Sequence, residues 1–544
     1  MGYVLKILSY FFGLFSSLPA GSDLAKLHNL LMLNRVSSPP LAGGSKVLLV
    51  QCVEDPYYLI LFDGLVNSIR ENISVRVELF IPRSFNSAIG TGWKSWIVRL
   101  PPLNWLLSRQ WINMWESVST KVGYKSTSFH PLWDCLDLVA SCILWKKINE
   151  ASQLKRIQIS GVDCGDLIID SFLRFRPSPR IVVNYPFMLY LIWQAHRDIR
   201  RSRDYFNRVK PALYLTTYTT YIQHGIAARV AVQEGVRTFS FGNHQEIAKL
   251  LTEGDVFHTR NCFNYKKDFK LLKDSEIKIL EASKEIEKRL SGGIDSSTAY
   301  MRVSAYNEVL PDIKNIENSV VVFLHDFYDS PHVYGELVFS DFWDWICFTI
   351  RTLKDAGIRF LIKPHPNQIA LSDSVITELR NIFPDLELIP ADITNAQLVR
   401  AGIVCAVTVY GSVAHEMAYM GIPTISCAVN PHISFGFCHT AKSLSEYKFF
   451  LENAVNIKAM NVNATLYREE ALEFYVMHNL SYENDYISLR NRLIFIWLKI
   501  NTVPYDINQI MSDFNEAQKM RSYCDIIDNF SITKELDKIK CGVG

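Results

Sequence analysis

The sequence of 544 residues lacks the patterns that mark several large classes of protein. Its eleven cysteines are spread thinly between Cys52 and Cys541, with no Cys-x-x-Cys pair and no Cys/His spacing suited to zinc. An odd count without a disulfide framework indicates reduced thiols and predicts a cytoplasmic protein. We therefore expect no metal site, and nothing in the sequence calls for a cofactor.

A strong charge of one sign and a long apolar run are also missing. The net charge is +2, and no basic face of the kind that binds phosphate backbones is apparent, so nucleic acid is not an expected partner. No run of eighteen apolar residues predicts a membrane-spanning helix. The nearest candidate, residues 4–18, is short and contains Lys6. An interfacial helix on a membrane and a helix packed on the protein explain it equally well, and a signal peptide explains it less well.

The residues that are present are those of an ordinary globular protein. Apolar residues make up 49% of the chain and charged residues 21%. The length exceeds the usual limit of one hydrophobic core, so two domains are expected. Internal repeats and low-complexity segments are absent from the sequence.

Alternating strand and helix patterns predict an α/β fold with two Rossmann-like domains facing a cleft. Residues 93–149 carry Trp and Leu at helical spacing and are expected to be helical. The expected strands are residues 46–52, 75–81, 156–159, 211–217 and 236–241, then 319–324, 359–363, 386–389, 403–409 and 424–427. The expected divisions are an N-terminal segment and linker (1–45), a first domain (46–290), a connection (291–318), a second domain (319–500) and a helical tail (501–544).

The strongest motif, Lys363-Pro-His-Pro-Asn367, directly follows an expected strand. Prolines on both sides of His365 restrict the backbone there. A rigid histidine at a strand end can bond a phosphate or stabilise charge on a leaving phosphate. Lys363 and Asn367 are candidates for binding the same ligand, and a proline-rich turn with an incidental histidine is the alternative.

The second motif runs from Gly411 and Ser412 to Glu416 at the end of another expected strand. Gly411 permits a tight turn, and Ser412 is expected to cap a helix whose free N–H groups could hold a phosphate. Glu416 lies one helical turn further on the same face and could accept hydrogen bonds from ribose hydroxyls. The alternative is an ordinary strand-to-helix turn with Glu416 in solvent.

Weaker candidates lie after other strands. Asp166 and Asp170 are one helical turn apart, so either could act as a catalytic base, with Asp166 preferred, or could merely favour the helix dipole. His224 could face the cleft, although a lone histidine is more often structural. Asp326 and Asp329 open the second domain and could contact a sugar. A Ser-Gly-Gly-x-Asp-Ser sequence at 291–296 resembles a pyrophosphatase loop, but a charged helix precedes it, so we expect a turn between domains.

These motifs resemble the C-terminal domain of GT-B glycosyltransferases that assemble bacterial capsules and lipopolysaccharides. The similarity rests on Lys363-Pro-His-Pro, on Tyr410-Gly-Ser-Val-Ala-His-Glu416 and on Gly421-Ile-Pro423. The His-Pro motif is similar to that of bacterial sialyltransferases and Kdo transferases, where it faces the donor phosphate. The resemblance implies that His365 acts on the donor phosphate and that Glu416 holds the ribose.

The resemblance therefore implies transfer of a sugar from a nucleotide-sugar donor, with a CMP-sugar as one candidate, to a surface-polysaccharide or lipid-linked glycan acceptor. Asp166 and His365 are the expected catalytic residues. Because such acceptors are often lipid-linked, we expect a cytoplasmic protein that contacts the inner face of the membrane. An epimerase or hydrolase of nucleotide sugars with the same fold, and a non-catalytic assembly subunit, are the alternatives.

Overall fold

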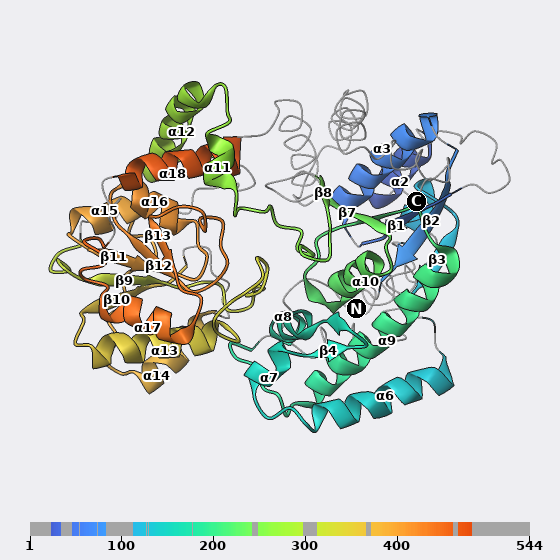
Figure 1. Ribbon diagram of the computed structural model, residues 1–544, viewed down its shortest axis with the longest axis horizontal. Coiled ribbons are helices and arrows are strands. Elements are labelled where there is room, and N and C mark those ends of the chain that lie inside the picture. The colour runs from blue at the N-terminus through green and yellow to red at the C-terminus, as the bar shows by residue number, and fades with distance from the viewer. Residues whose placement is uncertain are drawn as a thin grey trace, which may run out of the picture.

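The computed structural model describes residues 23–33, 46–82, 112–296, 313–460 and 466–480, apart from residues 54, 73, 127, 129, 177, 242–247 and 366–371. They form two α/β domains that lie side by side (Figure 1). The expected segments 4–18 and 501–544 lie outside the described residues.

The first domain is built on one six-stranded sheet in the order β3-β2-β1-β6-β7-β8. All neighbours pair in parallel except β7 and β8. The strands are β1 (Val47–Gln51), β2 (Arg76–Ile81), β3 (Val122–Lys125), β6 (Leu213–Thr216), β7 (Arg237–Phe241) and β8 (Ala248–Leu250). The order reverses between β1 and β6, as in a Rossmann sheet.

Both faces of this sheet are covered, which explains why β1 is buried along its whole length and apolar from Val47 to Val50. Leu48 and Val50 join one core and Leu49 joins the other. The helices of the domain are α2 (Asp23–Leu33), α3 (Pro56–Asn72), η1 (Trp115–Ser117), α6 (Pro131–Trp145), α7 (Ala151–Lys155), α8 (Gly165–Phe175), α9 (Pro186–Val209) and α10 (Tyr221–Gln233).

The second domain repeats the architecture. Its parallel sheet has the order β10-β9-β11-β12-β13. A parallel bridge between Ile362 and Leu388 adds a sixth position beside β10, where residues 386–389 were expected to be a strand. The strands are β9 (Val320–Phe323), β10 (Phe360–Lys363), β11 (Cys405–Val407), β12 (Thr424–Ser426) and β13 (Cys438–Thr440). The order reverses between β9 and β11.

The helices around this sheet are α13 (Phe342–Asp355), α14 (Ser372–Ile382), α15 (Asn395–Arg400), α16 (Val413–Tyr419), α17 (Leu444–Glu452), α18 (Tyr467–Tyr475) and η4 (Val476–Leu480). Two earlier helices, α11 (Tyr265–Phe269) and α12 (Ser275–Leu290), also pack here, against α18 (Figure 1). The chain therefore passes to the second domain before residue 262, and the boundary expected at residue 290 falls at the end of a helix of the second domain.

Two local predictions were wrong. Residues 122–125 form β3 although the whole stretch 93–149 was expected to be helical, because the short strand gains its stability by pairing with β2. Residues 386–389, also expected to be a strand, form none and make only the single bridge between Leu388 and Ile362. The short strand expected at residues 156–159 is confirmed as β4 (Gln158–Ile159), which pairs antiparallel with β5 (Val162–Asp163) as a small hairpin outside the main sheet. The remaining expected strands are confirmed within one or two residues at each end.

Candidate functional site at the domain junction

The motifs of the second domain lie together at the carboxyl ends of its central strands. His325 follows β9, His365 follows β10, and Gly411 follows β11. Two of these residues interact electrostatically: a positive charge on His365 adds to the effect of burial in lowering the pKa of His325. Ligands of open parallel sheets bind at this position, where the strand order reverses.

The turn after β11 is fixed by His325. Its Nε2 lies 3.0 Å from the Thr408 hydroxyl and accepts a hydrogen bond of 3.2 Å from the backbone N–H of Val409. Burial, together with His365, lowers the pKa of His325 to about 3, so the ring is neutral. A Cβ atom at Gly411 would lie 2.9 Å from the Thr408 oxygen, which explains the glycine.

The side chains of His365 and Asp329 keep part of their surface exposed to solvent, while the surrounding protein displaces water from the rest. Burial and the charge of Lys363 lower the pKa of His365, and the charge of Asp329 partly opposes this effect. Asp326 and Asp329 each accept a hydrogen bond from a nearby backbone N–H, from Tyr328 and Ser330. Asn367 lies outside the described residues.

Lys363 points inward. Its side chain is buried and its Nζ donates to the carbonyl of Ala391 at 2.7 Å. Burial lowers the pKa of Lys363 to about 8, although the charges of Glu416 and Asp392 oppose the shift. Lys363 therefore supplies positive charge from beneath the site, and in this state it does not present its ammonium group at the surface.

Glu416 is held by two partners from other elements. Its Oε1 accepts from Nε of Arg289 at 2.6 Å, and its Oε2 accepts from Nδ2 of Asn395 at 2.6 Å. The carboxylate is buried. A ribose could use only the lone pairs that these two bonds leave over, so Glu416 can meet a ligand only at close range and from one direction.

Ser412 is the N-cap residue of α16, as predicted, but the expected capping bond of its side chain is not formed. The backbone of Ser412 is already helical (φ −58°, ψ −19°) and its side chain makes no capping hydrogen bond. Its hydroxyl instead accepts a hydrogen bond of 3.3 Å from Nη2 of Arg289, whose Nη1 donates to Oδ1 of Asp295, also at 3.3 Å. Arg289, at the end of α12, thus joins Ser412 and Glu416 to the 291–296 turn, which follows a helix as expected.

Asp166 is engaged by Arg229. The guanidinium bonds both carboxylate oxygens, one of them at 2.8 Å. Burial alone would raise the pKa of Asp166, but the charge and hydrogen bonds of Arg229 outweigh it and lower the pKa. A carboxylate with a lowered pKa and both oxygens bound is a poor proton acceptor.

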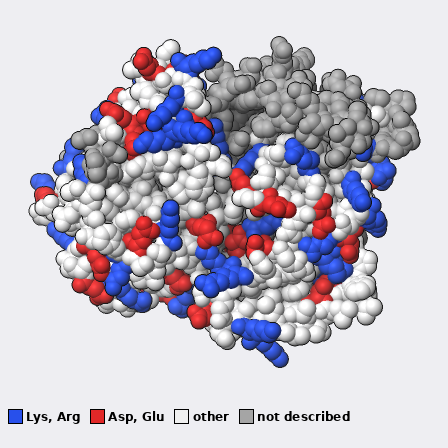
Figure 2. Space-filling model, in the orientation of Figure 1, with Lys and Arg blue, Asp and Glu red and all other residues white. Residues whose placement is uncertain are grey.

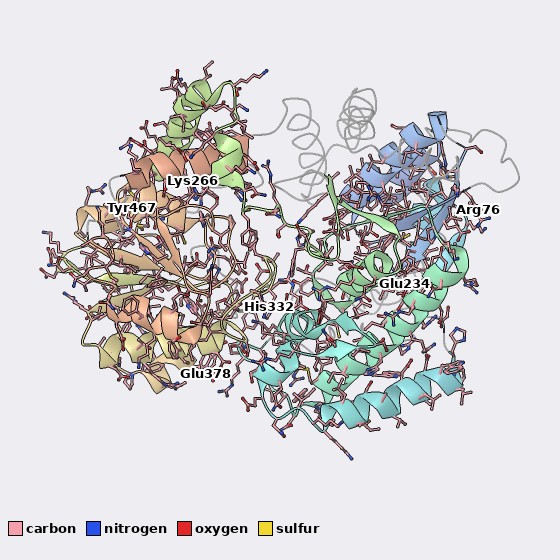
Figure 3. All side chains as sticks on the ribbon, viewed as in Figure 1. Arg76, Glu234, Lys266, His332, Glu378 and Tyr467 are labelled. Atoms are coloured by element: carbon pink, nitrogen blue, oxygen red, sulfur yellow. The ribbon has the colours of Figure 1, made fainter. Side chains whose placement is uncertain are left out.

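Asp170 has the opposite character, and its partner comes from the other domain. Its carboxylate lies 2.8 Å from Nδ1 of His332, and both side chains are buried. Burial raises the pKa of Asp170 to about 6, against the lowering effect of His332. Among the described residues, Nε2 of His332 has no hydrogen-bond partner. Figure 3 shows His332 where the two domains meet.

The segment that follows β6, where the strand order of the first sheet reverses, also lies at this junction. Tyr221, which opens α10 after β6, has a φ of 62°, an uncommon value for a residue other than glycine. Burial raises the pKa of Tyr221, and the charge of Asp329 in the second domain raises it further. The ligand-binding edges of both sheets therefore face one junction.

His224 lies within the first domain. It is buried, and its ring centroid is 4.4 Å from that of Tyr218. Burial, with a smaller contribution from His258, lowers the pKa of His224 to about 3. Its environment is that of a neutral core histidine.

Four residues of this region were missed as site residues: His332, Arg289, Asn395 and Arg229. His332 lies only three residues after Asp329, but its partner Asp170 is 162 residues away in the chain. Arg289 lies on a helix that appeared to be a connection. Among the described residues, no cluster of three or more His, Cys, Asp or Glu side chains could hold a metal ion. No helix in the described ranges is both long and apolar enough to cross a membrane.

No protein-family model matches the sequence, and no curated protein matches it either. Among solved structures, the chain is similar to the UDP-GlcNAc 2-epimerase from Neisseria meningitidis bound to UDP-GlcNAc, with 12% identity and a TM-score of 0.27 over 84% of this chain and 100% of that chain. It is also similar to the spinosyn rhamnosyltransferase SpnG complexed with spinosyn aglycone, with 10% identity and a TM-score of 0.24 over 79% and 96% of the two chains.

TM-scores this low do not indicate a shared function. The fold is established by the strand orders: two Rossmann-like α/β domains whose ligand-binding edges meet, which is the arrangement called GT-B.

Proposed function

We propose that this protein is a glycosyltransferase that moves a sugar from a nucleotide-sugar donor to a surface-polysaccharide or lipid-linked glycan acceptor. The process is capsule or lipopolysaccharide assembly, at the inner face of the cytoplasmic membrane. The observation that supports the proposal best is the contact between Asp170 and His332, which places an unoccupied ring nitrogen at the junction of the two domains.

In this proposal His332 is the catalytic base, and Asp170 takes the place of Asp166. An ionised Asp170 accepts the Nδ1–H of His332, which fixes the tautomer and leaves the Nε2 lone pair for the proton of the acceptor hydroxyl. A buried nitrogen without a partner is unfavourable, so a hydroxyl that reaches it is favoured. Because the pair joins two domains, the base exists only when they are closed, and closure also excludes water.

The donor occupies the second domain. As the acceptor oxygen bonds the anomeric carbon, the bond from that carbon to the donor phosphate oxygen breaks, and His365 stabilises the charge on the leaving phosphate. Arg289 and Lys363 add positive charge beside Ser412 and Glu416. Glu416, held by Arg289 and Asn395, is the group that meets the ribose.

An epimerase or hydrolase would use the same donor site without an acceptor. The experiment is therefore to measure consumption of CMP- and UDP-sugars with and without a glycan acceptor, in the wild type and in His332→Gln. Acceptor-dependent consumption that His332→Gln abolishes supports transfer. Equal consumption without acceptor assigns the site to an epimerase or hydrolase. If no donor is consumed at all, the protein is the non-catalytic assembly subunit.

A further inference from the structure

Helix α6 carries its apolar side chains on the outside of the protein. Residues at positions 132, 136, 139 and 143 recur at helical spacing and form one face. All of them, with the neighbouring tryptophan, are more than half exposed: Leu132, Trp133, Leu136, Val139 and Ile143. In Figure 2 the lower right edge of the molecule, over α6, is mostly uncharged.

The polar face of α6 is the one that packs against the protein. Asp134 and Asp137 both bond Arg200 of α9, at 2.9 and 2.7 Å. Ser141 lies 3.0 Å from Nδ1 of His196, also on α9. A helix on the surface of a soluble domain normally has the reverse orientation, with its apolar face inward. Partly buried ion pairs hold α6 in this orientation, so its apolar face is available to a partner.

Positive charge lies at both ends of this apolar face. Lys146 and Lys147 directly follow α6 and are exposed. At the other end, beside Trp133, is a cavity of about 570 Å³. One carboxylate, that of Asp204, lines it together with these cationic side chains: Lys125, Arg200, Arg201 and Arg208. Some of these are already engaged; Arg201, for example, donates to the carbonyl of Ser126 at 2.8 Å.

We propose that α6 is a membrane-docking helix that lies flat in the surface of an anionic phospholipid bilayer. Its apolar face enters the boundary between headgroups and acyl chains, while the lysines and the basic cavity contact lipid phosphates. With 15 residues α6 is too short to span a bilayer. Cations at the ends of an apolar face match an anionic lipid surface better than a second copy of the same face, because identical cations would repel each other.

The test is flotation of the full chain with vesicles of phosphatidylcholine alone and of an equimolar mixture of phosphatidylcholine and phosphatidylglycerol. In the triple variant Leu136→Gln/Val139→Gln/Ile143→Gln we expect the bound fraction to fall at least about tenfold, because three apolar side chains lose their favourable transfer from water. Lys146→Glu/Lys147→Glu should remove the preference for the anionic vesicles. Unchanged circular dichroism and melting temperature would show that both variants are folded.

The matched control is Ile277→Gln/Leu280→Gln on α12, where two apolar side chains that are even more exposed belong to the other domain. This control should bind vesicles as the wild type does. Two results would overturn the proposal. If the triple variant still binds vesicles, the membrane contact belongs to residues 4–18. If no form of the protein binds vesicles and the wild type forms a dimer that the triple variant loses, the apolar face of α6 binds a second copy of the chain.

Discussion

Replacing Asp170 by Asn should slow sugar transfer while leaving donor binding nearly unchanged. The amide has the shape of the carboxylate but no charge, so it cannot stabilise a protonated His332 at 2.8 Å or fix its tautomer. A positioned base contributes about 10²–10⁴-fold to a rate. We expect kcat to fall by that factor, or about 2.7–5.5 kcal/mol of transition-state stabilisation, with the donor KM within about threefold of the wild type.

The assay is steady-state transfer with saturating acceptor, and the matched control is Asp163→Asn. Asp163 is exposed on the β4–β5 hairpin near Asp166 and its carboxylate bonds Gln158, so kcat should not change. His332→Gln should lose as much as Asp170→Asn. The double variant should be no slower than the worse single variant, because two residues that act as a unit are not additive.

Additive losses would mean that Asp170 and His332 do not act together. If kcat survives in Asp170→Asn and falls in Asp166→Asn, the base is Asp166, and the ion pair with Arg229 must open during the reaction. If only the melting temperature falls, the interdomain pair is structural.

The remaining predictions concern the donor site and stability. His365→Ala should abolish transfer in a protein that melts like the wild type, since the side chain is exposed; near-normal turnover would remove it from the mechanism. Glu416→Ala should lower the free energy of unfolding by about 1–3 kcal/mol in urea titrations, because it removes the acceptor of the buried Asn395 amide, whereas Glu416→Gln should mainly weaken calorimetric binding of free nucleotide. Burial lowers the pKa of His224 and His415 to about 3 and also lowers that of His432. The unfolded chain therefore binds more protons below about pH 6.5, and each group should cost up to about 1.4 kcal/mol per pH unit as the pH falls, so a melting temperature that is constant from pH 7 to 5 would contradict their burial as neutral rings.

The sequence was most informative where structure is local. Parallel strands buried on both faces are continuous apolar runs, so β1, β6 and β9 were predicted within one or two residues at each end. The motifs were recognisable because the prolines beside His365 restrict the backbone and the glycine at position 411 permits a tight turn at a strand end. The resulting site is also local: each motif follows the strand that positions it.

The parts that were missed depend on contacts between distant residues. β3 forms only by pairing with β2, and residues 122–125 carry no strong strand pattern of their own. The partner of Glu416 is 127 residues away on α12, a helix whose charged sequence suggested a connection. Ser412 was expected to cap α16, but the hydroxyl is taken by the same distant arginine.

The most direct test of the central claim is a crystal structure of the protein with a bound nucleotide sugar. We predict that the ribose lies beside Glu416, the phosphate beside His365 and Ser412, and the anomeric carbon toward Nε2 of His332. A nucleotide bound elsewhere, such as in the basic cavity beside Trp133, or a sugar that points away from His332, would contradict both the donor site and the base proposed here.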